Sequence, residues 1–276
     1  MQKTLLCVII LLVLTSCTRR GQDLDDIPTR VGSLDDLATS QILTRNAPPE
    51  GFRETVAFPQ VDANLNDLSN WHYTMTLDFE GVFANTSRPA RASTSLDVWF
   101  NQFDQSRRVV LTAEGILLGT EAEEPLQREG VRLGPDTFYV LDSVCQGRGS
   151  ADADLLADLR AGDIIGGLLQ ARSISERGVI HSEDVWRYDF GVDDLNIPAL
   201  QFNDNSVIAA LTGEFWVAPE HGAVIRFWVT MDVENVIITF LSNDADTALP
   251  VSGRVILRYD LFDIGVNPNI TQPFGC

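Results

Sequence analysis

Lysine is almost absent from this chain of 276 residues, since Lys3 is the only one. Lys3 lies in a leader that export would remove, so we expect a mature protein without lysine. This excludes mechanisms that need an amine nucleophile or a lysine that holds a phosphate. The mature chain keeps 19 arginines against 39 acidic residues, a net charge of about −20 that repels nucleic acid and anionic headgroups. No nucleic-acid partner is therefore expected.

Residues that carry common catalytic chemistry are also scarce. The three histidines, His72, His181 and His221, stand far apart and form no pair at metal-binding spacing. The sequence has no G-x-S-x-G nucleophile elbow and no S-x-x-K motif. We therefore expect no enzyme, no metal site and no cofactor. An unrecognised hydrolase remains the less favoured alternative, because a glycosidase needs only two carboxylates that face each other.

No apolar run is long enough to span a membrane. The longest, from Leu5 to Leu14, has half of the roughly 20 residues that a spanning helix needs. With Lys3 before it, this run is typical of a secretory signal peptide. The following Leu14-Thr15-Ser16-Cys17 resembles a lipobox, in which cleavage leaves the cysteine as a lipid-modified N-terminus. The sequence thus predicts a lipoprotein signal peptide over residues 1–16 and a lipid (palmitate) anchor on Cys17.

This leader predicts a protein outside the cytoplasm of a bacterium, held to the cell membrane or outer membrane by its lipid. An uncleaved membrane anchor is the alternative. Residues 17–50 are polar, with aspartate clusters and Pro48-Pro49 at the end, and are expected to form a flexible tether with a reach on the order of 30 Å. The clusters are most simply solvated charge, although calcium binding is a second interpretation. A single folded domain is predicted over residues 51–276.

Two of the four cysteines are expected in the folded domain. Cys7 would leave with the signal peptide and Cys17 would carry lipid, which leaves Cys145 and Cys276. Two thiols outside the cytoplasm favour one disulfide. Closing a loop of about 130 residues removes roughly 5 kcal/mol of unfolded-state entropy. Metal binding by this distant pair is the weaker alternative.

Alternation of apolar and polar residues dominates the domain. From Trp71 to Glu80, apolar and polar residues alternate strictly, which indicates a strand with one solvated face. Further strands are predicted over 94–101, 107–114, 131–133, 138–141, 177–181, 185–190, 213–218, 223–233, 236–241 and 254–261. Because strand follows strand, the pattern favours an antiparallel sheet. Helical spacing predicts a helix over 152–171, whose glycines weaken its middle so that it can break into two pieces packed on the sheet. A second, shorter helix is expected over 203–211.

The order of these elements resembles the LolA-like superfamily, in particular its bacterial lipoprotein branch. The similarity lies in Gly213-Glu214-Phe215-Trp216-Val217, Ile225-Arg226-Phe227-Trp228-Val229, Arg258-Tyr259-Asp260 and the prolines Pro268 and Pro273. The resemblance implies an α+β fold in which a single strongly curved antiparallel sheet, an open half-barrel, carries about two helical segments on its concave side. In this superfamily the space between sheet and helices can hold an acyl chain, and several members carry lipids or lipoproteins across the envelope.

The apolar faces of the strands form a protein core or, in part, a ligand pocket. The aromatic and long apolar side chains exceed what two thin helices need for cover, so a partly open pocket is expected. Its candidate lining is Trp71, Tyr73, Met75, Phe79, Trp186, Tyr188, Phe215 and Phe227. The predicted function is a membrane-anchored extracytoplasmic lipoprotein that binds an apolar or lipid ligand for transfer in the envelope. The alternative is a non-catalytic module that docks another envelope protein.

Overall fold

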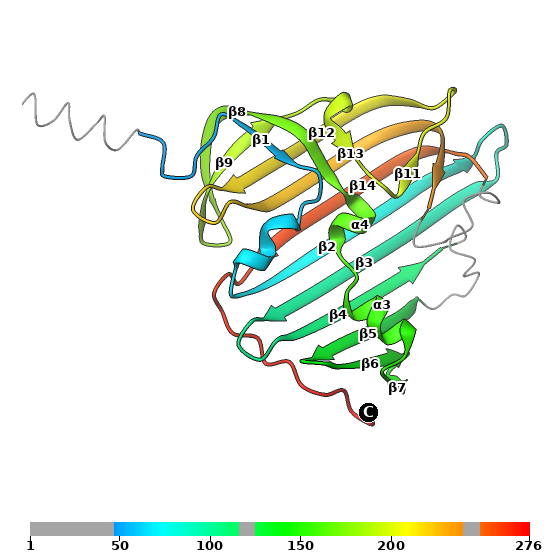
Figure 1. The fold of residues 1–276 in the computed structure, drawn as a ribbon. Coiled ribbons are helices and arrows are strands. Elements are labelled where there is room, and N and C mark those ends of the chain that lie inside the picture. The colour runs from blue at the N-terminus through cyan, green and yellow to red at the C-terminus, as the bar shows by residue number, and fades with distance from the viewer. Residues whose placement is uncertain (1–46, 116–124, 240–248) are drawn as a thin grey trace, which may run out of the picture. The chain divides into compact units, whose positions relative to one another are not determined.

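The computed structural model describes residues 47–115, 125–239 and 249–276. The predicted signal peptide, Cys17 and nearly all of the predicted tether lie outside the described residues. Residues 49–276 form one compact unit, built almost entirely from antiparallel strands (Figure 1). The prediction of a mostly antiparallel, open sheet with few helices is confirmed.

Within the described residues, one sheet contains 14 strands. In chain order these are β1 (Thr55–Phe58), β2 (Asn70–Phe83), β3 (Pro89–Asn101), β4 (Ser106–Glu114), β5 (Leu126–Leu133), β6 (Asp136–Leu141), β7 (Val144–Arg148), β8 (Gly167–Ile180), β9 (Glu183–Asp189), β10 (Leu195–Asn196), β11 (Leu200–Gln201), β12 (Val207–Ala218), β13 (Ala223–Ile238) and β14 (Val251–Phe262). The spatial order is β1-β8-β9-β12-β13-β14-β2-β3-β4-β5-β6-β7, and β10 and β11 pair with β8 and β13. The sheet does not close, because β1 and β7 remain as edge strands.

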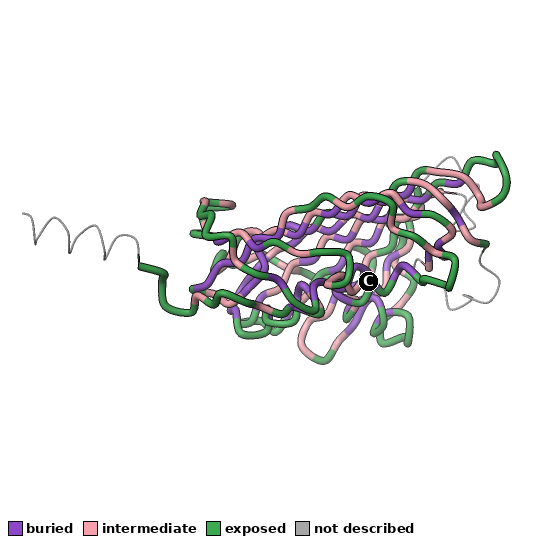
Figure 2. The backbone as a smooth tube through the Cα atoms, turned by 90° about the horizontal axis from the view of Figure 1, so that it is seen from above, coloured by how far each residue is buried: buried purple, intermediate pink, exposed green. Residues whose placement is uncertain are grey.

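The central ladder joins β14 to β2 without a bulge, from Val251 opposite Phe83 to Phe262 opposite His72. Regular pairing keeps the alternation in phase, so one side of both strands is apolar throughout. Figure 2 shows buried residues alternating with more exposed ones along the strands. The predicted strand 236–241 differs from the structure, since Val236 to Ile238 continue β13 beyond a bulge at Asn235, which has φ of 55°.

The helix predicted over 152–171 is two short helices followed by a strand. These are α3 (Ala151–Ala157) and α4 (Ala161–Ile165). Ser150 caps α3 by accepting a hydrogen bond from the Ala153 N–H at 3.1 Å. Gly166, with φ of 58° and ψ of −120°, ends α4, and β8 begins at Gly167. The segment thus consists of two helical pieces, as expected, but it ends at Gly166 and does not continue to residue 171.

The second predicted helix, over 203–211, is wrong. Asn203 to Ser206 form a turn, in which the Ser206 N–H donates to the Asn203 carbonyl at 2.9 Å. From Val207 onward the chain is β12, paired with β13. Pairing along a neighbouring strand outweighs the apolar spacing that suggested a helix, since β-branched residues favour a pleated surface. Two 3₁₀ turns, η2 (Ala63–Asp67) and η4 (Val192–Asp194), complete the described elements.

Helix α3 packs on strands β4, β5 and β6. The backbone of Gly130 lies so close to the helix that a Cβ at this position would be 2.6 Å from the Ala157 nitrogen. The Arg107 guanidinium donates to the carbonyl oxygens of Ala157 and Leu159 at 2.5 and 2.6 Å. These bonds satisfy carbonyls that a helix end leaves without partners.

The margin at β7 carries the disulfide between Cys145 and Cys276, the pair that the sequence singles out, with Cα atoms 5.4 Å apart. Because 131 positions separate the two cysteines, the bridge closes a large loop around the second half of the chain. It fixes the segment that follows β14 to the margin of the sheet.

Candidate functional site: an apolar groove beside β1

The structure buries all eight candidate pocket residues on the apolar face of the sheet. None is more than 5% exposed, and Tyr73, Phe215 and Phe227 are fully buried. Their rings contact one another: Trp71 stacks on Tyr73 at 5.3 Å, and Phe215 meets Phe227 edge-on at 5.6 Å between ring centroids. These arrangements are typical of a packed aromatic core.

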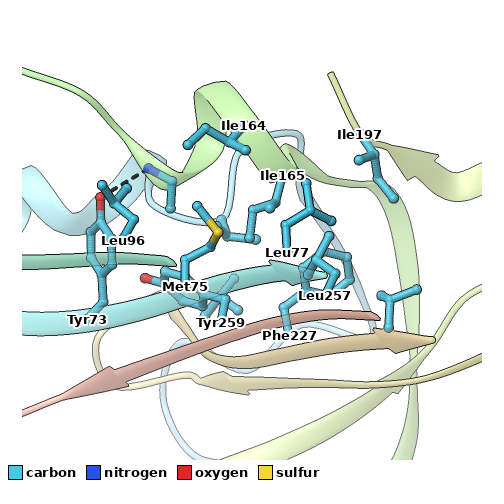
Figure 3. Packing of buried hydrophobic residues seen from close by; sticks show 14 of the residues in the cluster. Tyr73, Met75, Leu77, Leu96, Ile164, Ile165, Ile197, Phe227, Leu257 and Tyr259 are labelled. Carbon is cyan, nitrogen blue, oxygen red and sulfur yellow. Dashed lines mark hydrogen bonds between the residues drawn. The ribbon is translucent and has the colours of Figure 1, made fainter. Parts of the chain in front are cut away.

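Helix α4 covers the middle of this face. Ile164 and Ile165 point from α4 toward Met75, Leu77 and Leu257 (Figure 3), and all five side chains are at most 2% exposed. We call this region, together with Tyr73, Phe227 and Tyr259, the α4 interior. Its side chains are in contact, so the candidate residues serve here as protein core.

A polar network fixes α4 over the sheet. The Ala161 N–H, at the start of α4, donates to the Tyr73 hydroxyl at 3.0 Å. That hydroxyl lies 3.4 Å from Oδ2 of Asp62, and the Arg160 guanidinium donates to the Asp62 carbonyl at 2.7 Å. Burial, and next the nearby Asp62 carboxylate, raises the pKa of Tyr73 well above its usual range. Burial raises the pKa of Tyr259 in the same way.

An open groove of about 600 Å³ lies on the side of β1. We call it the β1 groove. Its apolar lining comes from β1, β8, β9 and β12 and from the turn after β12: Val56, Ala57, Phe58, Leu169, Tyr188, Val217 and Pro219. Polar side chains also contribute to the lining, namely Arg53, Thr55, Asn64 and Gln170. Leu169 is 53% exposed, so this groove presents apolar surface to solvent.

Three contacts position the walls of the β1 groove. The Tyr188 hydroxyl donates to the Arg53 carbonyl at 2.8 Å, and the Asn64 side chain donates to the Gly222 carbonyl at 2.7 Å. Gly51, with φ of 82°, lets the chain pass so close to Pro219 that a Cβ would lie 2.5 Å from its carbonyl oxygen. Hydrogen bonds therefore hold the chain before β1 to β9 at Arg53 and the chain after β1 to the β12–β13 turn at Asn64.

Of the eight candidates, only Tyr188 lines the β1 groove. Sequence reasoning missed Val56, Leu169 and Val217. Val56 lies in a strand of four residues, too short for its alternation to be recognised. Leu169 was assigned to the predicted helix. The signal that could have found Leu169 is the Gly166-Gly167 pair, which ends the helix just before it.

Two of the three histidines, although far apart in sequence, meet around one ring. Phe262 lies 4.1 Å from the ring of His181 and 5.5 Å from that of His72. Asp260, 8% exposed, accepts from Arg226 at 2.8 Å and from Trp228 at 2.6 Å, and lies 3.1 Å from the His181 Nε2. Every oxygen of this carboxylate has a partner, so the cluster is a structural network.

Across residues 47–115, 125–239 and 249–276, no three histidine, cysteine or acidic side chains are grouped so as to hold a metal ion. In the same part of the chain, no helix has both the length and the apolar character to cross a membrane.

No family model matches the sequence. No curated protein matches it significantly.

Proposed function

We propose that this protein is a lipid-anchored lipoprotein outside the cytoplasm that binds an apolar or lipid ligand in the β1 groove and passes it on within the cell envelope. Cys17 would hold the lipid anchor, and the polar segment up to Pro49 would act as the tether. In this proposal the sheet is the curved half-barrel of a LolA-like protein, with α3 and α4 on its concave side. The ligand lies beside β1, because α4 and its neighbours fill the space beneath the helices.

The observation that carries the proposal is the groove beside β1, in which Leu169 presents apolar surface to solvent at 53% exposure. Its volume of about 600 Å³ falls in the range of roughly 300–1,000 Å³ that is typical of small-molecule sites. An apolar tail would cover Leu169 and the side chains beside it, a burial that stabilises the complex by about 25 cal/mol per Å². Arg53 and Gln170 would hydrogen-bond a polar headgroup.

The chemistry of the lining supports capture rather than catalysis. None of the side chains that line the β1 groove is a carboxylate, a histidine or a cysteine. Hydrolysis needs a nucleophile or a general base within hydrogen-bond reach of the substrate. Tyr188, the titratable side chain deepest in the groove, donates its hydroxyl proton to the Arg53 carbonyl, and burial raises its pKa.

Displacement of a fluorescent fatty acid tests this function. The chain from residue 17 onward, with Cys17→Ser to keep it free of lipid, is titrated with 11-(dansylamino)undecanoic acid. We expect saturable binding that Leu169→Gln weakens by about tenfold, equivalent to roughly 1.4 kcal/mol. Val179→Gln is the matched control, because Val179 is 69% exposed on the same strand but does not line the groove. Absence of binding, or equal loss in both variants, would contradict the proposal.

A further inference from the structure

The first half of β12 has one unpaired edge, although the strands around it are paired. Strand β9 pairs with β12 only at Phe215, Trp216 and Val217. Among the described residues, no strand pairs with Val207 to Gly213 on the side away from β13. Figure 1 shows β12 next to the segment that carries β11. Roughly half of the backbone N–H and C=O groups of this stretch point away from β13, where they can pair with an added strand.

An apolar groove of about 330 Å³ runs beside this edge. It is lined by Val192, Leu195, Ile197, Phe202 and Ile208, with Asp193 and Ser206 as polar members. Phe202 is 51% exposed and Val192 is 44% exposed. On the strand itself, Val207 is 50% exposed. A free strand edge with an adjoining apolar groove provides both backbone pairing and a place for a side chain. We call the two together the β12 edge site; it shares no lining residue with the β1 groove.

The segment that forms the β12 edge site carries negative charge only. From Tyr188 to Ile225 the chain holds six acidic residues and neither arginine nor lysine. Three of the six, Asp193, Asp194 and Asp204, lie within the stretch that forms the groove. An acidic surface of this kind attracts a basic partner and repels a second copy of this acidic chain.

We propose that the β12 edge site binds an extended peptide segment of a partner protein, with apolar side chains between arginine or lysine residues. The segment adds a strand to Val207–Gly213, places an apolar side chain against Phe202 and Ile208, and sets its basic residues opposite Asp193 and Asp204. The free backbone edge selects an extended chain, the groove selects an apolar side chain, and the aspartates select positive charge.

A labelled synthetic peptide tests the proposal. Fluorescein-labelled Arg-Val-Thr-Val-Thr-Val-Arg is titrated with the chain from residue 17 onward carrying Cys17→Ser, and binding is followed by anisotropy. Two further peptides are compared, one with glutamate in place of both arginines and one with proline at the central valine. We expect binding by the first peptide alone, because glutamate reverses the charge and proline removes a backbone donor. Hydrogen exchange of the complex should show new protection at the amides of residues 207–213.

Substitutions locate the peptide. Phe202→Glu is expected to weaken binding about tenfold, while Phe103→Glu, at a phenylalanine that is 79% exposed elsewhere, leaves it unchanged. Asp193→Asn combined with Asp204→Asn is expected to weaken binding by about three- to tenfold and to reduce its salt dependence. Asp152→Asn is the matched control.

Four outcomes would overturn the proposal: no binding of the basic peptide, equal binding of all three peptides, protection away from β12, or self-association of the protein through β12 in place of peptide binding. Fatty-acid binding in the β1 groove is measured separately, and none of these outcomes would contradict the function proposed for that groove.

Discussion

The α4 interior and the β1 groove belong to one sheet, yet one is filled and the other is open. In the α4 interior, Ile164 and Ile165 of α4 pack against the strands. Beside β1, the covering chain is tied at Arg53 and Asn64 and leaves Leu169 half exposed. The two regions differ in their cover and in their side chains, because the groove also has the polar lining residues Arg53, Thr55, Asn64 and Gln170.

Shortening a side chain in each region is expected to give the largest contrast. Phe227→Ala should lower the free energy of unfolding by about 3–5 kcal/mol, because it leaves a cavity among buried rings. Leu169→Ala should change it by less than about 1 kcal/mol, because the side chain is half exposed. Urea unfolding followed by circular dichroism measures both. Comparable losses would show that the β1 groove is closed core in solution.

Two glycines with nearly equal φ allow a comparison of how tightly the chain packs at the end of α4 and beside the β1 groove. Gly166 at the end of α4 has φ of 58° and Gly222 beside the β1 groove has φ of 57°. A Cβ at Gly166 would lie 1.8 Å from the Asn196 carbonyl oxygen, whereas nothing is within 4 Å at Gly222. Alanine should cost about 1–2 kcal/mol in backbone strain at Gly222. It should cost more at Gly166, where ψ of −120° lies outside the left-handed helical region, with a further 1–3 kcal/mol from overpacking. Thermal unfolding of the two variants checks the order.

Removing the disulfide is expected to affect stability without affecting the β1 groove. Replacing Cys145 and Cys276 together by serine should lower the free energy of unfolding by about 2–4 kcal/mol, since the unfolded chain gains entropy. Affinity for the fluorescent fatty acid should stay the same, because neither cysteine lines the groove. A fall in affinity of the folded double variant would show that the bridge shapes the groove.

Alkaline titration distinguishes the tyrosines of the two regions. Burial raises the pKa of Tyr73 far more than that of Tyr188. A raised folded-state pKa means that the folded protein keeps the proton while the unfolded chain loses it near pH 10. The resulting stability is present below about pH 10 and is lost as the pH rises above it. Absorbance at 295 nm should show Tyr188 ionising before Tyr73 and Tyr259, which ionise together only on unfolding. Tyr73→Phe should reduce the amplitude of that unfolding step by about half, because Tyr259 still contributes to it.

Much of the fold follows from local alternation along the chain. Long strands such as β2 and β13 have one solvated face, so their period-two pattern is visible in the sequence. The strands β1 and β7 were missed because four or five residues carry too few repeats. The false helix over 203–211 arose because Val207, Ile208 and Leu211 are spaced as on a helix, while their pairing with β13 depends on residues far along the chain.

The location of the proposed site was harder to predict from the sequence than the fold. Alternation identifies which face is apolar, and all eight candidates do lie on that face, but it does not show which part of the face is covered. Val56 and Leu169 become neighbours in the β1 groove only because β1 pairs with β8. That pairing is non-local, and no pattern around either residue encodes it.

Because β14 lies between β13 and β2, the centre of this sheet can pair only when nearly the whole chain is available. The ladder that completes the middle joins residue 72 to residue 262, so β2 and β13 keep bare edges until the last long strand reaches them. Non-local pairing of this kind slows folding to milliseconds or longer, and unpaired edges aggregate meanwhile. Refolding from urea should therefore be slow, with a yield that falls as the protein concentration rises.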